Sequence, residues 1–422
     1  MTLNFDLDKS FTLGDYASAV KPDASDRFVG LRIRKSGPEL IFPLGFNVPE
    51  SESELKSDAR RLLQLLSRFD HERGFDVENA DSKTLLPENS FILRSYMLLI
   101  EDYLSSGRLL SESDSHFLDS AVGQVDWPRT IASNRPYISD GNVVYLNLVS
   151  RRRYSRPDSL VKNAHELALS ISFHFVGWMY PENPFSRIPA RRASNGTILA
   201  VKRRIQNTFD DRELRLLQAI HAVLTYSASD EFGAPQVFGT NAFESIWEFL
   251  VERAFGNIFD MKLKYFPRSS WLLNGHVKHT NPLLPDTIML HDESTFILDA
   301  KYYRYGASRN PRHLPGNSDI AKQVVYGEHA ASVHDFRNQG EIYNAFLMPG
   351  EVNSENNKWC EVVGVSSVSW VPNPKRHQVI VLVVIDVRFL FRKYSSHGLT
   401  LKTELANCIV DFFNSDSELR TL

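Results

Sequence analysis

The residues best suited to chemistry are two aspartates and a lysine in the C-terminal half of the chain. Pro285-Asp286 begins a segment that we expect to be a strand, and Asp299-Ala300-Lys301 lies on the next expected strand. Because side chains alternate along a strand, Asp299 and Lys301 project from one face while Ala300 turns into the core. If the two strands pair as a hairpin, Asp286 approaches Asp299. Two converging carboxylates form an oxygen site that suits Mg²⁺.

A lysine beside such a metal can orient water and stabilise the charge that develops on a phosphate. The pattern therefore predicts metal-assisted phosphodiester hydrolysis, with Mg²⁺ as the cofactor and Mn²⁺ as a substitute for it. The motif is short, and it has a structural alternative. In that alternative, Asp286 starts a turn and Asp299 forms a surface ion pair with Lys301.

Three glutamates upstream of the aspartates share one face of an expected helix. Glu244, Glu248 and Glu252 follow one another at intervals of four residues. We expect Glu248, which has an aromatic residue on each side, to face the metal as a third ligand. The alternative is a solvated acidic stripe in which Glu244 closes a capping box with Asn241.

Gln323 is the last candidate for the catalytic set. It shares one face of an expected helix with Tyr326, three residues further along. From that face both side chains could contact the metal shell or the DNA backbone. A plain helix surface is the alternative.

The hydrophobic pattern predicts a mixed α/β fold. The nearly continuous apolar run from Val379 to Val387 is typical of a strand that is covered on both faces. Expected strands cover residues 28–33, 39–42, 143–148, 287–290, 295–303 and 379–387, and expected helices cover residues 53–69, 91–104, 160–176, 211–226, 243–255, 319–329 and 401–413. We divide the chain into an α+β domain at residues 1–120, a mainly helical middle region at 121–233 and a domain at 234–422 in which helices pack on a sheet.

Composition excludes several protein classes. The chain has 422 residues, is 42% hydrophobic and carries a formal net charge of −3, which is typical of a globular protein rather than a disordered or coiled-coil one. Two cysteines are too few for a disulfide framework or a thiolate zinc site. No apolar run reaches the roughly 18 residues that span a bilayer, and the N-terminus does not have the pattern of an export signal. We therefore expect a cytoplasmic protein that does not bind a membrane.

Two basic segments are candidates for DNA contact, because Lys and Arg side chains neutralise phosphates. The first has a tyrosine interleaved among its arginines, and the second contains no acidic residue from Arg187 to Arg204. A solvated surface or a contact with an acidic partner are the alternatives. The DNA-binding candidates are Arg151, Arg152, Arg153, Arg191, Arg192, Lys202, Arg203 and Arg204.

The ordered set of motifs resembles the nuclease part of LlaJI-type restriction endonucleases, which are relatives of the McrC nuclease subunit. The residues that carry the resemblance are Phe238-Gly239-Thr240-Asn241, Trp247-Glu248, Pro285-Asp286, Asp299-Ala300-Lys301 and Asp319-Ile320-Ala321-Lys322-Gln323, with further similarity at Phe42-Pro43-Leu44-Gly45-Phe46, from Gly123 to Ile131 and around His165. The resemblance implies a restriction-endonuclease-like PD-(D/E)xK core at residues 234–422. It also implies that Asp286, Asp299 and Lys301 are catalytic with Mg²⁺.

The resemblance further implies a separate AAA+ NTPase subunit, similar to McrB, that translocates double-stranded DNA. The sequence contains no G-x-x-x-x-G-K-[S/T] phosphate-binding loop, so we expect the motor to be another polypeptide. The leading hypothesis is an Mg²⁺-dependent DNA endonuclease that is the cleavage subunit of an NTP-dependent, anti-phage restriction system, with the N-terminal half docking the motor or contacting DNA. The alternatives are a motor-independent repair or recombination nuclease and a non-catalytic DNA-binding scaffold.

Overall fold

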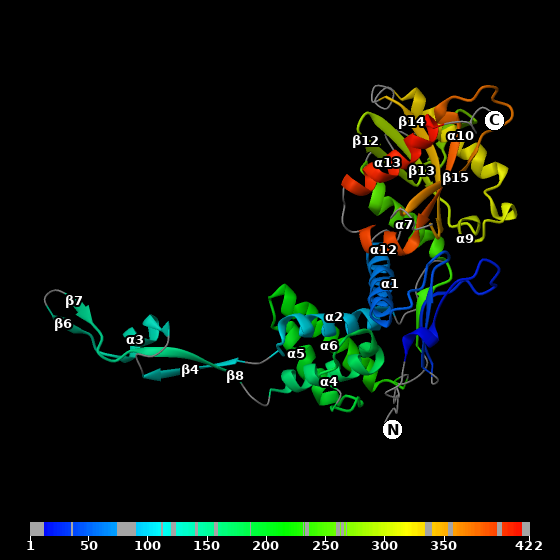
Figure 1. Cartoon of the computed structure of the whole chain (residues 1–422). Coiled ribbons are helices and arrows are strands. Elements are labelled where there is room, and N and C mark those ends of the chain that lie inside the picture. The colour runs from blue at the N-terminus through cyan, green and yellow to red at the C-terminus, as the bar shows by residue number, and fades with distance from the viewer. Residues whose placement is uncertain are drawn as a thin grey trace. The chain divides into compact units, whose positions relative to one another are not determined.

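The chain folds into two compact units, one of residues 1–6 and 91–234 and the other of residues 7–90 and 235–422. The computed structural model (Figure 1) describes residues 12–34, 37–73, 90–110, 113–119, 124–139, 142–155, 159–185, 187–230, 232, 236–258, 262, 266, 268–333, 340–352, 358–394 and 399–415. We describe each unit by itself. The three-domain division made from the sequence stays a prediction.

The larger unit begins with a four-stranded sheet in the order β1-β3-β2-β9. Its strands are β1 (Ala17–Ala19), β2 (Val29–Arg34), β3 (Gly37–Phe42) and β9 (Gln236–Thr240), preceded by the 3₁₀ turn η1 (Leu13–Tyr16) and packed against α1 (Glu52–Arg73). Gly30 of β2 lies opposite Gly239 of β9. A Cβ on Gly239 would lie 2.2 Å from the Val29 carbonyl oxygen, so this strand pair requires glycine there.

The second sheet of this unit has the order β12-β13-β14-β16-β15. The strands are β12 (Thr287–His291), β13 (Ser294–Ala300), β14 (Ile342–Gly350), β15 (Cys360–Ser366) and β16 (Ile380–Asp386). β13, β14 and β16 are parallel, and the two edge strands are antiparallel to their neighbours. The predicted mixed sheet is therefore confirmed.

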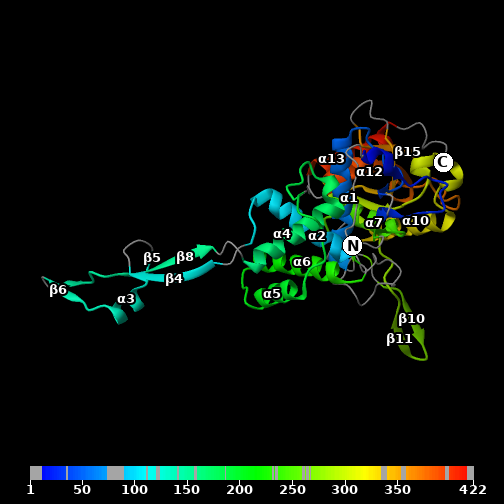
Figure 2. The same ribbon diagram turned by 90° about the horizontal axis from the view of Figure 1, so that it is seen from below.

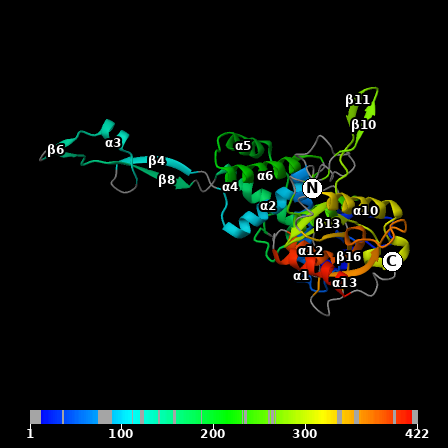
Figure 3. The same ribbon diagram turned by 90° about the horizontal axis from the view of Figure 1, so that it is seen from above.

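Helices cover both faces of this sheet (Figure 3). On one face, Tyr326 of α10 (Asn317–Ser332) packs in a cluster with Ile297 of β13. On the other, Phe296 stacks on Tyr343, which contacts Phe413 of α13 (Leu399–Asn414). The remaining elements are α7 (Phe243–Phe255), β10 (Ser270–Leu273), β11 (His276–His279), α9 (Tyr305–Ser308), η4 (Pro311–His313), α10 (Asn317–Ser332), η6 (Arg376–Gln378), α12 (Val387–Lys393) and α13 (Leu399–Asn414). The mixed α/β fold predicted from the sequence is confirmed.

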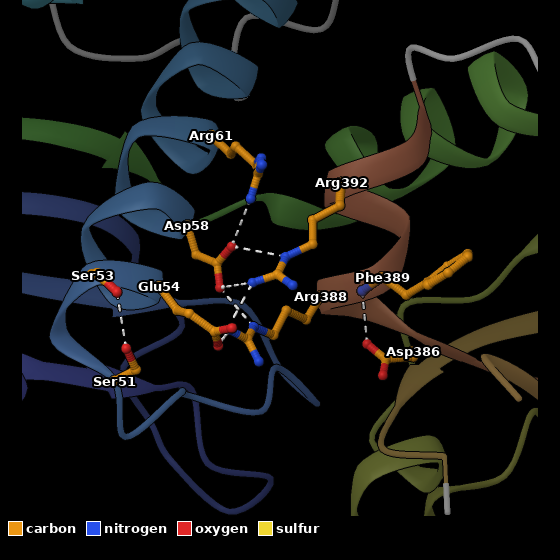
Figure 4. Close-up of polar contacts among 9 residues, drawn as sticks. All are labelled: Ser51, Ser53, Glu54, Asp58, Arg61, Asp386, Arg388, Phe389 and Arg392. Atoms are coloured by element: carbon orange, nitrogen blue, oxygen red, sulfur yellow. Dashed lines mark hydrogen bonds and ion pairs between the residues drawn. The ribbon is translucent and has the colours of Figure 1, made fainter. Parts of the chain in front are cut away.

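A buried ion network joins α1 to α12 within the larger unit (Figure 4). The Asp58 side chain is 1% exposed and accepts hydrogen bonds from Arg61 at 3.1 Å, from Arg388 Nε at 2.6 Å and from Arg392 Nε at 3.2 Å. Glu54, one turn earlier on α1, contacts Arg388 from a more exposed position. The network fastens the N-terminal helix to the helix that directly follows β16.

The smaller unit combines a group of helices with a β-ribbon (Figure 2). The helices are α2 (Ser90–Ser106), α4 (Leu160–Val176), η2 (Gly177–Met179), α5 (Asn195–Gln206) and α6 (Asp211–Ala228). The ribbon contains β4 (Ser113–Asp119), β5 (Gln124–Val125), α3 (Trp127–Ser133), β6 (Tyr137–Ser139), β7 (Asn142–Val144) and β8 (Val149–Ser155). The strand predicted at residues 143–148 is wrong, because β7 ends at Val144 and the long strand β8 starts only at Val149.

The other expected elements are confirmed with small shifts of their ends, except one. The strand predicted at residues 295–303 ends at Ala300, so Lys301 lies directly after β13 rather than on it. The backbone N–H of Lys301 still donates to the Leu347 carbonyl at 2.9 Å. In the part of the chain that the structure describes, no helix is long and apolar enough to cross a membrane.

His165 on α4 makes the stability of the smaller unit depend on pH. Its side chain is fully buried, its Nδ1 accepts a hydrogen bond from the Leu110 N–H at 3.1 Å, and burial lowers its pKa from 6.5 to about 4. Below pH 6.5 the unfolded chain therefore binds a proton that the folded chain does not. We expect unfolding midpoints in urea to fall as the pH drops from 6.5 to 4, by a total that corresponds to about 3 kcal/mol.

The substitution His165→Gln isolates this contribution from those of other titrating groups. The variant should lose stability less steeply than the wild type over the same pH range. Identical slopes for the two proteins would contradict the assignment.

Candidate active site

The β12–β13 hairpin brings the two predicted aspartates together. Thr287 pairs with Leu298, so Asp286, just before β12, lies beside Asp299 near the end of β13. The backbone N–H of Ala300 donates to Asp286 Oδ2 at 2.8 Å. The Asp286 carboxylate is therefore turned toward β13 and held there.

Lys301 lies between two carboxylates. Its Nζ is 2.7 Å from Asp299 Oδ2 and 3.2 Å from Asp319 Oδ1, at the start of α10. The Asp299 and Lys301 side chains are only 3% and 14% exposed. The ion pair of the structural alternative thus forms, but it is buried and does not lie on the surface.

Burial and the crowding of negative charge together determine the electrostatics of this cluster. The pKa of Asp286 is raised to about 8, first by burial, then by Asp299 and then by Glu248. Burial alone would lower the pKa of Lys301, but the charges of Asp299 and Asp319 outweigh it and raise that pKa above its ordinary value. One acidic group is therefore costly to ionise here without a further cation.

The three glutamates of α7 have different surroundings. Glu248 lies close enough to Asp286 to raise its pKa. Glu252 forms an ion pair with Lys262, whose Nζ also donates to the Asp286 carbonyl oxygen. Glu244 lines a separate cavity beside Tyr302. The structure thus brings Glu248 to the aspartates, as expected, and leaves Glu252 engaged by Lys262.

Gln323 and Tyr326 hold the backbone around the cluster. Gln323 is 1% exposed, and its Nε2 donates to the Ile297 carbonyl at 3.0 Å and to Asn344 Oδ1 at 3.3 Å. The Tyr326 hydroxyl donates to the Leu284 carbonyl at 2.6 Å, two residues before Asp286. The plain helix surface of the alternative is therefore wrong for both residues.

Sequence reasoning did not identify three members of the cluster, which are Lys262, Tyr303 and Asp319. The Tyr303 hydroxyl donates to Asp319 Oδ2 at 2.9 Å. This hydrogen bond orients the second of the two carboxylates that contact Lys301. Asp319 stood within a quoted motif, but nothing in the local pattern indicated its contact with Lys301. Lys262 lies after the end of α7, so the helical spacing of the glutamates gave no indication that it contacts Glu252.

All eight DNA-binding candidates lie in the smaller unit. Arg151 is exposed on β8, while the side chains of Arg152 and Arg153 lie outside the described residues. Arg192 is 3.7 Å from Asp230, and Arg204 is 2.7 Å from Glu213. The remaining candidates, Arg191, Lys202 and Arg203, are exposed.

The donor set fits a divalent cation. Asp299 Oδ1 is buried and has no hydrogen-bond partner within the described residues, although it belongs to a carboxylate. Hard carboxylate oxygens are the preferred ligands of Mg²⁺ and Mn²⁺. Within the same residues, no three His, Cys, Asp or Glu side chains are already grouped around one metal-sized point.

Comparison with known proteins identifies a family for this chain. No curated protein matches the chain. One similar solved structure is a half-complex from a tetradecameric assembly of Thermococcus gammatolerans McrB AAA+ hexamers with bound McrC, at 12% identity and a TM-score of 0.37, covering 91% of this chain and 83% of that one. A family model described as LlaJI restriction endonuclease matches residues 28–388. The chain therefore belongs to the LlaJI restriction endonuclease family, whose members are nucleases of restriction systems.

Proposed function

We propose that this chain is an Mg²⁺-dependent endonuclease that hydrolyses phosphodiester bonds of double-stranded DNA, with Asp286, Asp299 and Lys301 as its catalytic residues. The observation that carries the proposal is the buried cluster at the ends of β12 and β13. There, Lys301 Nζ lies 2.7 Å from Asp299, and the unpartnered Oδ1 of Asp299 is available to a cation. Family membership supports the same class of reaction.

Each side chain of the cluster has a distinct proposed role. Asp286, Asp299 and Glu248 would hold the metal, which supplies Lewis-acid stabilisation of the phosphate and an activated water. An ammonium group has three N–H donors. Asp299 and Asp319 take two of those of Lys301, so the third remains for the attacking water or a phosphate oxygen.

Gln323 has a different proposed role from the one expected. Its amide nitrogen already donates to Ile297 of β13 and to Asn344 of β14. We therefore propose that Gln323 is a positioning residue that fixes the backbone of β13 and, with it, the position of Asp299. It would act on the reaction through the backbone of Ile297 rather than by touching DNA.

We also propose that cleavage requires a separate AAA+ NTPase subunit, similar to McrB, that acts with this chain on DNA in the cytoplasm. The resemblance to McrC-type subunits motivates this, and the sequence has no phosphate-binding loop of its own. The candidates of the smaller unit whose side chains are exposed are proposed to contact the DNA that the motor moves. They are Arg151, Arg191, Arg192, Lys202 and Arg203.

The experiment that tests the function is plasmid cleavage by the wild-type chain in Mg²⁺, alone and with a McrB-like NTPase plus GTP or ATP. The proposal predicts cleavage that requires both the metal and the NTPase. Cleavage by the chain alone would support a motor-independent nuclease instead. A folded chain that cuts none of a varied set of methylated and unmethylated DNAs would contradict the catalytic proposal.

The tip of the β-ribbon is the proposed contact for that partner. Ile138 of β6 and Val143 of β7 face each other and are 79% and 62% exposed, and Tyr137 and Val144 beside them are also exposed. Apolar side chains gathered in this way favour a protein contact. We expect Ile138→Asp with Val143→Asp to weaken NTPase binding and NTPase-dependent cleavage about tenfold or more.

The control for the tip variant is Leu399→Asp. Leu399 is 72% exposed at the start of α13, in the larger unit. We expect the Leu399→Asp substitution to leave NTPase binding unchanged. Co-sedimentation with the NTPase measures the binding of the tip variant and of the control. Equal binding by the tip variant and the wild type would rule this contact out.

A further inference from the structure

A cavity lies in the larger unit beside the candidate active site. Its volume is about 470 Å³, and Tyr302 and Tyr303, directly after Lys301, form part of its wall. The opposite wall comes from residues 20–27, between β1 and β2, and from Leu44 after β3. The cavity is thus built by the N-terminal sheet together with the loop that follows β13.

The charge of the cavity wall is strongly positive. Four Lys or Arg residues line it against one acidic residue, Glu244, and His313 adds a further nitrogen base. The four cations are Lys21, Arg27, Arg304 and Arg312. Within the described residues, none of these four side chains forms an ion pair with a carboxylate, whereas Arg309 on the same loop is paired with Glu361. Unpaired cations around a cavity favour an anionic ligand.

The loop that carries Arg304 and Arg312 is held in place. The Leu44 N–H donates to the Tyr302 hydroxyl oxygen at 2.7 Å, which joins the two walls. Gly306 packs so closely on β14 that a Cβ there would lie 2.1 Å from the Pro349 carbonyl oxygen. Ser308 Oγ lies 2.7 Å from His313 Nδ1, and this hydrogen bond fixes the turn next to Arg312.

Short hydrogen-bonded links connect the cavity to the catalytic lysine. Tyr303, in the cavity wall, donates to Asp319 at 2.9 Å, and Asp319 contacts Lys301 at 3.2 Å. A polyanion that occupies the cavity would therefore pass next to the carboxylate cluster. Phosphates along a DNA strand suit a wall that carries several cations, since one phosphate can lie at the proposed metal while its neighbours contact arginines.

We propose that this cavity binds the phosphodiester backbone of the DNA strand that is cut, with Arg27, Arg304 and Arg312 as the phosphate contacts that position the strand on Lys301. The inference rests on the proposed nuclease function and adds the surface that orients its substrate. These contacts carry no base specificity, because they reach only the phosphates.

The test is a double variant, Arg304→Gln with Arg312→Gln, in the full-length chain. DNA binding is measured by fluorescence anisotropy with a short duplex in EDTA across a salt series, so that no cleavage occurs. We expect affinity to fall about tenfold or more and the slope of log affinity against log salt to become shallower by about two, one for each lost phosphate contact. In Mg²⁺ with the NTPase and its nucleotide, KM for DNA should rise, because the substituted residues bind the substrate.

The matched control is Arg309→Gln. Arg309 lies between the two arginines on the same loop, but it is paired with Glu361 and lines a different cavity. This control should bind DNA with the salt slope of the wild type. Thermal unfolding checks that all variants are folded, and Arg27→Gln on the opposite wall should reproduce the effect on binding.

The outcomes separate this inference from the proposed function. If the double variant binds DNA with wild-type affinity and salt slope, the inference is overturned, whether or not the protein cleaves. A wild-type chain that binds no duplex at low salt overturns it as well. If the wild type does not cleave but the double variant binds DNA more weakly with a shallower slope, the backbone-binding surface stands and the nuclease proposal fails.

Discussion

Asp299→Asn is expected to lower the rate of DNA cleavage by about 10³-fold at saturating Mg²⁺, while DNA affinity changes little. The substitution keeps the shape of a side chain that is 3% exposed but removes its charge and one of its two oxygens. The proposed metal would lose a ligand, and Lys301 would lose the closer of the two carboxylates that contact it. Losing one preorganised electrostatic contact typically costs about 10²- to 10³-fold, and loss of the metal adds to that. Single-turnover cleavage measures the effect.

The control for this variant is Asp292→Asn in the turn of the same hairpin. Asp292 has a φ of 49°, which asparagine tolerates, and its side chain is 86% exposed. Cleavage by the control should stay within about twofold of the wild type. If Asp299→Asn, folded and binding DNA normally, cut as fast as the control, Asp299 would not be a metal ligand.

Asp58→Ala is expected to destabilise the larger unit by about 2 to 3 kcal/mol. A buried carboxylate with three arginine partners is removed, and Arg388 and Arg392, 20% and 32% exposed, are left without it. Breaking a fully buried pair costs about 3–5 kcal/mol, and the partial exposure of the arginines reduces that figure. The shift of the urea unfolding midpoint, followed by Trp fluorescence, gives the value.

Glu54→Gln provides the comparison for Asp58→Ala. Glu54 contacts the same arginines, but its side chain is 50% exposed, so water can replace it. We expect a much smaller shift of the unfolding midpoint than for Asp58→Ala. Equal shifts would mean that burial of Asp58 does not determine the strength of the network shown in Figure 4.

The core of the candidate site could be predicted because its residues are close in sequence. The alternation of side chains on a strand and a two-residue turn between β12 and β13 are local features, and together they bring Asp286 to Asp299. The spacing of the glutamates likewise placed one of them on the face of α7 toward the sheet. Three-dimensional placement then distinguished Glu248 from Glu252, which Lys262 holds.

Two strands of the second sheet, the central strand β14 and the edge strand β15, could not be predicted from local patterns. β14 contains Asn344, Pro349 and Gly350, residues that normally interrupt strands. It forms because Asn344, fully buried, donates through Nδ2 to the Gln323 carbonyl at 3.2 Å and to the His377 carbonyl at 2.5 Å, which satisfies a polar group in the core. β15 pairs with β16 through an irregular register near Gly364, and its residues are only half-buried.

Contacts between distant parts of the chain could not be predicted from the sequence either. The pairing of Asp58 with Arg388 spans 330 residues, and the cavity beside Lys301 joins residues 20–27 to residues 302–314. Neither leaves a periodic signal, because each depends on how whole elements pack. The basic runs were visible, but only the structure shows that Arg204 is already paired with Glu213.

The central proposal, that the carboxylates at the ends of β12 and β13 hold a catalytic divalent ion, is tested most directly by calorimetric titration of the chain with Mn²⁺. We expect the wild type and the Asp292→Asn control to bind Mn²⁺ at one site. The double variant Asp286→Asn with Asp299→Asn should have lost that site. A folded double variant that binds Mn²⁺ with the same heat and affinity as the wild type would contradict the proposal.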